Sequence, residues 1–213
     1  MPSSILSHQA PVLPLKIKYP HKFDGTALCL STFLPDLNVI FEPFFPYSFR
    51  DITHSLFGLI IWTLPLTIIM TIIFSKYLSS FLANIAKNSR ILTYFGIDQL
   101  GYLKEKRYNR KFFKIAFYSA IIGGLTHLLL DLPSHENIEL FWPWVIFQSP
   151  DFLLYSIIDF GSVEVGLSQI DANLTIYQLI WIAETFIGLI IALYFFRYIK
   201  KHNLISKWYQ EVQ

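Results

Sequence analysis

The sequence predicts an all-α, polytopic integral membrane protein, and three observations support this fold class. Of its 213 residues, 54% are hydrophobic and only 15% are charged, whereas soluble domains carry about 25% charged residues. The mean hydropathy is +0.45. Three long apolar stretches lie between polar segments. We therefore expect about three transmembrane helices, a short N-terminal helical hairpin and interfacial helices, all in one domain spanning residues 1–213.

The N-terminal part predicts the helical hairpin. Residues 1–15 are apolar and favour a short helix that begins near Ser3 or Ser4. A basic turn follows at residues 16–25, and residues 26–34 form a second apolar segment. Each segment has about half of the ~20 residues that cross a bilayer. We expect them to dip into the protein and return, which brings His8 and Asp36 to the same end.

The three apolar stretches predict the transmembrane helices. Residues 55–74 contain no charge, and Pro65 predicts a kink in that helix. A second helix is expected at residues 115–131, ending near Asp131 because Pro133 cannot continue it. A third is expected at residues 174–196, interrupted by Glu184. Residues 76–114 predict amphipathic helices on the membrane surface, and residues 136–171 predict a long segment with aromatic patches, part of it in the interface.

Charge predicts the orientation in the bacterial inner (cytoplasmic) membrane. Residues 76–114 carry nine Lys or Arg and two acids, whereas the stretch from Lys114 to Arg197 has no further basic residue and eight acids. The basic segments should therefore be cytoplasmic. This places the ends of the helices that carry His54, His127 and Asp131 at the external face. Because the basic residues segregate by region, the pI near 8.5 does not indicate a nucleic-acid partner.

The polar residues at this external end predict a metal site. His127 and Asp131 are four residues apart, so a helix presents both on one face. Mixed imidazole and carboxylate ligands suit a divalent ion, zinc first, and manganese or iron if more oxygens bind. A single cysteine excludes a cysteine-rich zinc site. The expected metal ligands are His8, Asp36, His54, His127 and Asp131.

A metal ion at this site would indicate a hydrolase. A bound ion would lower the pKa of a coordinated water, and the resulting hydroxide could attack an ester or phosphoester. His135 and Glu136 follow the same helix and are the candidate general base or acid. Membrane lipid is the expected partner, with a lipid-linked molecule as the possible substrate.

Other interpretations of the same residues stay open. The His127–Asp131 pair also fits a buried hydrogen-bonded pair. The cluster would then be a structural metal site, or a hydrogen-bonded set of polar side chains, in a non-catalytic membrane protein. Glu184 is either protonated and hydrogen-bonded or lines a cavity under the site. A transport pathway through Glu184 would need polar residues beyond it, and residues 187–196 offer almost none.

The order of short motifs resembles a known group of proteins. These motifs are Ser7-His8, Leu34-Pro35-Asp36, Thr53-His54-Ser55, the stretch from Gly123 to Asp131, and Trp142-Pro143. They resemble the predicted bacterial membrane-bound metal-dependent hydrolases, in an uncharacterised sub-branch, a group often related to zinc-dependent phospholipase C. The resemblance covers about residues 1–145 and implies a metal-dependent enzyme. It does not extend to residues 146–213, the interfacial segment, last helix and basic tail.

The sequence also departs from that group. Many members carry a second acidic residue and a histidine after Pro-Asp, where this chain has Leu37-Asn38-Val39. One expected ligand pair is therefore missing, which leaves the number of metal ions open.

Overall fold

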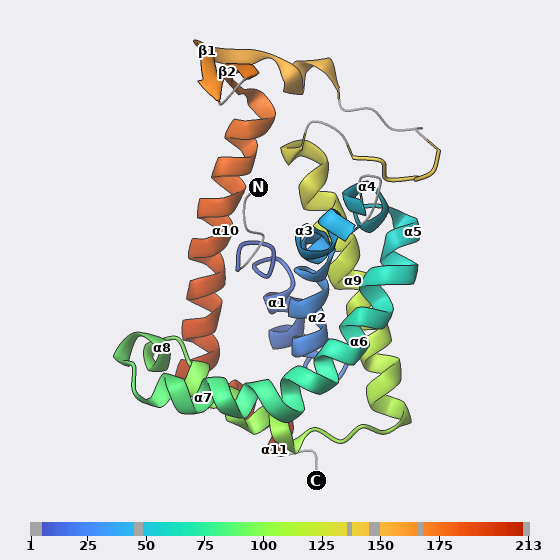
Figure 1. Ribbon diagram of the computed structural model, residues 1–213. Helices are drawn as coiled ribbons and strands as arrows, with labels where there is room; N and C mark the ends of the chain where they lie inside the picture. Colours follow the sequence, from blue (N-terminus) through green and yellow to red (C-terminus); the bar gives the residue numbers. More distant parts are fainter. Residues whose placement is uncertain (1–5, 45–48, 136–137, 145–149, 166–167, 211–213) are drawn as a thin grey trace.

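Helices dominate the structure, a computed structural model that describes residues 6–44, 49–135, 138–144, 150–165 and 168–210. Three helices are long and apolar enough to cross a membrane, at Leu56–Lys87, Arg110–Ser134 and Ile176–Lys201. They surround two short N-terminal helices, and all three connect the two ends of the molecule (Figure 1). The prediction of a mainly helical chain with three such helices is confirmed.

The first long helix is a continuous run with two π-helical turns. Its successive parts are α5 (Leu56–Gly58), η3 (Leu59–Thr63), α6 (Leu64–Ile73), η4 (Phe74–Leu78) and α7 (Ser79–Lys87). Thus the helix expected to end at Phe74 continues to Lys87, and α7 turns to run across the lower end of the molecule (Figure 1). Kinks of this kind form at π-turns. Hydroxyl side chains at every fourth position are fully buried along it, at Thr63, Thr67, Thr71, Ser75 and Ser79.

The second long helix, α9 (Arg110–Ser134), corrects one expectation. Asn109 caps its start, accepting a hydrogen bond from the Phe112 amide. The prediction that Pro133 ends the helix near Asp131 was wrong, because the helix continues to Ser134. The proline removes one hydrogen bond of the last turn only, and the Ser134 hydroxyl donates to the Leu130 carbonyl there.

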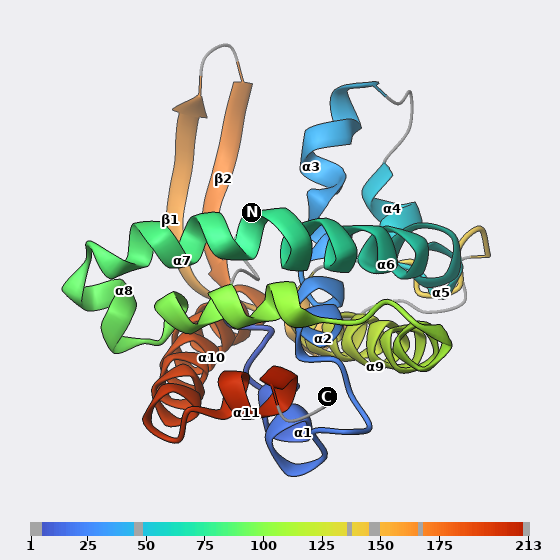
Figure 2. The same ribbon diagram turned by 90° about the horizontal axis from the view of Figure 1, so that it is seen from below.

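The third long helix, α10 (Ile176–Lys201), starts at a capping box of Thr175 and Gln178. A short helix α11 (Leu204–Gln210) follows it. At the lower end, α11 packs against η5 (Ile97–Glu105), which in turn packs against α7 and α8 (Arg90–Tyr94); Figure 2 shows these elements from below. The basic region of the sequence therefore folds into short helices at one end.

The N-terminal hairpin forms, but its first helix is shorter than expected. Residues 6–12 form turns, and α1 spans only Leu13–Lys18. Pro11 has no amide hydrogen, which disfavours a helix running through it. The chain then continues through α2 (Gly25–Ser31), η1 (Leu34–Leu37), α3 (Asn38–Phe41), η2 (Glu42–Phe44) and α4 (Phe49–Thr53). The expected helix start at residues 3–4 lies outside the described residues.

A β-hairpin at the upper end is an unexpected element (Figure 1). After η6 (Asp151–Leu154), strand β1 (Ser156–Val165) pairs antiparallel with β2 (Ser168–Thr175), so that Ser156 lies opposite Thr175. The all-α expectation was therefore wrong for this segment. Strand pairing satisfies its backbone hydrogen-bonding groups without a helix.

Candidate metal centre

Four His and Asp side chains from three parts of the chain meet near the upper end of α9. This helix supplies His127 and Asp131, η1 supplies Asp36, and His54 directly follows α4. One potential ligand atom from each residue lies within 4.8 Å of the others. We call these four residues the His/Asp centre. Three of them are at most 3% exposed, namely His54, His127 and Asp131.

Two glycines of α9 permit this convergence. A Cβ atom on Gly123 would collide with the Ser31 hydroxyl and lie 2.6 Å from the Leu28 carbonyl oxygen. A Cβ atom on Gly124 would collide with Leu59. Because neither glycine has a side chain, α2 and η3 approach the backbone of α9 closely. His127 and Asp131, one and two turns beyond Gly123, therefore reach residues that follow α2 and α4.

The spacing of the four ligand atoms matches a single small ion. Asp131 Oδ2 lies 3.2 Å from His127 Nε2 and 3.3 Å from His54 Nε2. Asp36 Oδ1 lies 3.1 Å from His54 Nε2 and 3.8 Å from His127 Nε2. Four ligands placed tetrahedrally at 2.0–2.1 Å from zinc are about 3.4 Å apart. The donor set and its dimensions therefore fit a divalent ion.

Backbone carbonyls fix the orientation of both buried imidazoles. His127 Nδ1 is 3.0 Å from the Thr32 carbonyl oxygen, and His54 Nδ1 is 3.1 Å from that of Arg50. Carbonyls only accept hydrogen bonds, so we assign a proton to each Nδ1. In a neutral ring, Nε2 then points a lone pair into the centre, as in histidines that bind metals.

Two atoms of the centre lack hydrogen bonds within the described part of the chain. These atoms are His127 Nε2 and Asp131 Oδ2, both buried. Unsatisfied buried polar atoms are costly. A cation between them would interact favourably with both, which is the second reason that the centre fits a metal.

His8 and His135 lie on the opposite side of the Asp131 carboxylate. Oδ1 of Asp131 is 3.4 Å from His8 Nε2 and 3.8 Å from His135 Nδ1. The structure thus places His8 beside the four-residue centre, with its ring centroid 5.0 Å from that of His127. His135 Nδ1 also contacts the Asp131 carbonyl oxygen at 3.3 Å. The pKa of His135 is lowered, mainly by burial.

The accessible side of the centre is formed by Asp36 and His135. Their side chains are 28% and 22% exposed, whereas His127 is fully buried. Burial alone would raise the pKa of Asp36, but its hydrogen bond with His54 holds this pKa below its ordinary value. The second catalytic candidate, Glu136, lies outside the described residues.

Comparison with protein-family models shows the family to which this sequence belongs. A family model described as a domain of unknown function (DUF4184) matches residues 1–211. The chain belongs to the DUF4184 family. No curated protein and no solved structure matches it. The resemblance to metal-dependent hydrolases stays a prediction.

In this DUF4184 chain, α10 also contributes to the surroundings of the centre. Glu184 lies beside Ser134 and within electrostatic range of His8 and Asp131. One turn further along α10, a Cβ atom on Gly188 would lie 2.8 Å from the Ser7 carbonyl oxygen. This position agrees with both roles considered for Glu184, a protonated and hydrogen-bonded side chain or one that lines the space under the site.

Sequence reasoning missed the groups that orient the ligands. The carbonyls of Thr32 and Arg50 hold the two imidazoles, and Gln9 donates a hydrogen bond to the Thr32 hydroxyl at 3.1 Å. Backbone carbonyls occur at every position and give no sequence signal. The position of Gln9 next to His8 was the one available indication.

Proposed function

We propose that this chain is a multi-pass membrane protein whose His/Asp centre binds a divalent ion, zinc first, and hydrolyses an ester or phosphoester of a lipid. The observation that carries the proposal is the geometry at Asp131 Oδ2. This oxygen faces two imidazole nitrogens at 3.2 and 3.3 Å, and it forms no hydrogen bond with any described residue. Two fixed lone-pair donors and a buried carboxylate in this arrangement favour a bound cation.

Each residue then has a distinct role. Asp36, His54, His127 and Asp131 would hold the ion, and His8 would orient the second oxygen of Asp131. A divalent ion supplies Lewis acidity, which activates water and polarises an ester or phosphoester. His135 lies at the accessible side, where it can transfer a proton to or from the substrate. Three helices long and apolar enough to cross a membrane support a lipid as the source of that substrate.

Elemental analysis of the purified protein in detergent tests metal binding. The wild type should retain about one ion per chain, and His127→Ala should lose it, because the substitution removes one of the four ligands. Lys87→Gln is the matched control, since Lys87 is exposed and hydrogen-bonds only to Asn84 among the described residues. Full metal occupancy in His127→Ala would overturn the assignment.

A second variant tests catalysis separately from metal binding. His135→Ala should keep the metal but lower kcat by a factor of about 10²–10⁴, the usual contribution of a proton-transfer group. Suitable substrates are bis(p-nitrophenyl) phosphate, p-nitrophenyl esters and phospholipids in mixed micelles. Equal rates for the wild type and His127→Ala would exclude hydrolysis at this centre.

The alternative is a non-catalytic cluster held together by charge-assisted hydrogen bonds. It is favoured by the distance of 3.1 Å between His54 Nε2 and Asp36 Oδ1, which suits a hydrogen bond if His54 is doubly protonated. This alternative predicts a metal-free protein at neutral pH. It also predicts that His127→Ala lowers the thermal stability and that no substrate is hydrolysed.

A further inference from the structure

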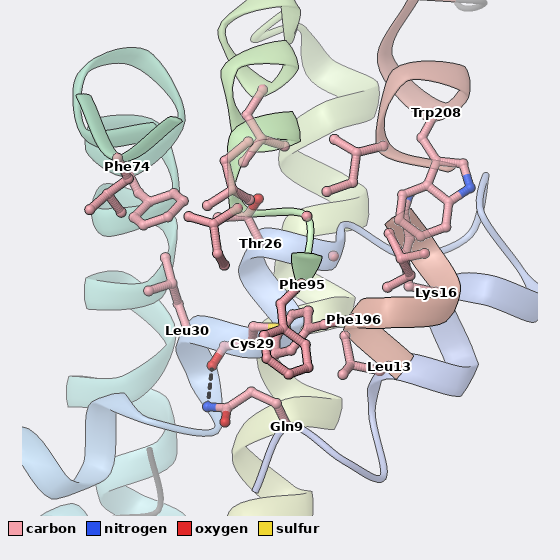
Figure 3. Close-up of a pocket in the computed structure, with 18 of the residues that line it drawn as sticks. Gln9, Leu13, Lys16, Thr26, Cys29, Leu30, Phe74, Phe95, Phe196 and Trp208 are labelled. Atoms are coloured by element: carbon pink, nitrogen blue, oxygen red, sulfur yellow. Dashed lines mark hydrogen bonds between the residues drawn. The ribbon is translucent and has the colours of Figure 1, made fainter. Parts of the chain in front are cut away.

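An apolar cavity of about 460 Å³ includes Gln9, the neighbour of His8 in the sequence, among its lining residues (Figure 3). Its wall is built from the N-terminal hairpin, η4, α7, η5, α10 and α11. Gln9 lines one end and Trp208 the other, with Cys29 and Phe196 between them. Its volume lies within the range of roughly 300–1,000 Å³ that is typical of ligand pockets.

A second, basic pocket of about 310 Å³ adjoins this cavity. Lys16, Trp208 and Tyr209 line both. The basic pocket has four Lys or Arg side chains but only two acids, and these residues are Lys16, Lys106, Arg107, Lys111, Asp24 and Glu105. The two spaces therefore form one amphipathic site with an apolar part and a positively charged part.

The positive charge of this site is only partly compensated within the protein. Lys106 contacts both oxygens of Asp24, at 3.0 and 2.9 Å, and donates to the Thr26 hydroxyl. The Lys16 residue is 4% exposed, and its ammonium group donates instead to the backbone carbonyls of Pro20 and Phe23. It also lies 4.9 Å from the centre of a Trp208 ring. A positive charge thus remains at the junction of the two pockets, with Arg107 and Lys111 exposed beside it.

The cavity is separated from the His/Asp centre. The Gln9 amide donates to the Cys29 carbonyl at 3.3 Å and to the Thr32 hydroxyl at 3.1 Å, and so closes that end (Figure 3). A molecule in the cavity would therefore place its polar group at the basic pocket, not at the His/Asp centre.

We propose that these two pockets bind one anionic lipid, with an acyl chain in the cavity and its phosphate-containing head group in the basic pocket. The apolar wall favours a hydrocarbon chain. Basic pockets at the cytoplasmic side of membrane helices bind anionic head groups, and the surrounding segments of this chain are its most basic. This site is separate from the proposed hydrolytic centre and does not depend on its activity.

Native mass spectrometry of the full-length, delipidated protein tests this proposal. After incubation with phosphatidylglycerol or phosphatidylcholine of the same chain length, the wild type should retain one phosphatidylglycerol and little phosphatidylcholine. The double variant Arg107→Gln/Lys111→Gln should bind phosphatidylglycerol roughly 25-fold more weakly, because each cation near an anionic head group contributes about a factor of five. Lys87→Gln, a basic residue at the same end that lines neither pocket, should bind like the wild type.

The role of the cavity in binding the acyl chain is tested by substitutions that fill the cavity. Leu100→Trp should prevent lipid retention, and Leu82→Phe provides a smaller change that serves if Leu100→Trp does not fold; both residues line the cavity. Millimolar glycerol 1-phosphate should not displace the lipid, because it lacks the chain. Equal retention of the two lipids, displacement by glycerol phosphate, or undiminished binding in the folded cavity variant would each overturn the proposal.

Discussion

Two buried polar clusters lie at opposite ends of this molecule, and they differ in how their charges are satisfied. In the lower cluster, Lys106 has three acceptors, and Asp24 both binds Lys106 and caps α2 through the Ala27 amide. In the His/Asp centre, by contrast, His127 Nε2 and Asp131 Oδ2 face each other without a hydrogen bond. Burial of charge is common to both, so burial alone does not indicate a ligand. The unsatisfied lone pairs distinguish the centre that fits a metal.

The largest expected effect tests whether the lower cluster is structural. Lys106→Met leaves the Asp24 carboxylate buried without its partner, which should lower the free energy of unfolding by about 3–5 kcal/mol. The metal content of the folded fraction should stay unchanged. Denaturation in detergent micelles, followed by circular dichroism, measures the first quantity. The double variant Asp24→Asn/Lys106→Met should recover most of the lost stability, because Asn can still cap α2. A loss of metal from Lys106→Met without a loss of stability would show that the two clusters are coupled.

A pH series on the lipid-free protein examines the second lysine of the lower cluster. Burial lowers the pKa of Lys16 to about 8, although Asp24 opposes this shift. Between this value and the ordinary value near 10.5 the unfolded chain binds more protons, so stability should rise with pH across that window. The increase should be at most about 3 kcal/mol. Melting temperatures from pH 7.5 to 10 should therefore rise more steeply for the wild type than for Lys16→Met. Equal slopes for the two proteins would show that the lowered pKa of Lys16 is not the cause of the rise.

Added zinc should stabilise the protein only by binding to the His/Asp centre. At a free concentration of 100 times Kd, the ion should add about 2.7 kcal/mol to the free energy of unfolding. The metal-free wild type and Lys106→Met should show the same increment, since Lys106 lies in the other cluster. His54→Ala should show none. A zinc-induced rise in the melting temperature of His54→Ala would place the ion elsewhere.

The smallest effect concerns the close packing that forms the His/Asp centre. Gly123→Ala would place a methyl group against Ser31 and the Leu28 carbonyl, at an expected cost of about 1–3 kcal/mol. It should also weaken metal binding, because α2 and η1 must move away from α9. Gly101→Ala is the control, since its Cβ would lie an ordinary 3.4 Å from Ala83. Equal metal affinity in both variants would show that this spacing does not set the centre.

Much of the helical fold could be predicted because its helices coincide with long uncharged stretches. Their ends were less predictable, since capping by Asn109 and Thr175 and the π-turn at Phe74–Leu78 depend on local contacts. The β-hairpin gave no clear periodic signal. Neighbouring Ile157 and Ile158 are both 46% exposed. Within residues 156–161, the part of the first strand whose side chains are described, no buried face imposes the alternation of apolar and polar residues.

The convergence of the His/Asp centre followed from the topology, because the charge pattern placed the ends of the helices at one level. What could not be predicted was the division of the Asp131 carboxylate between two sides. One oxygen faces His54 and His127, and the other faces His8 and His135. This division depends on the rotation of one side chain, which residue spacing does not determine.

The contact between Gly188 and Ser7 has a consequence for the biosynthesis of the protein. Gly188 belongs to the last long helix, and a Cβ atom there would lie 3.1 Å from the Ser7 Cα atom, directly before His8. The support behind His8 is therefore synthesised more than 170 residues after His8 itself. His54, His127 and Asp131 can assemble earlier, but the N-terminal segment can reach its final position only after α10 has left the ribosome and docked. We therefore expect the placement of His8 beside the His/Asp centre to be a late step in the maturation of the chain.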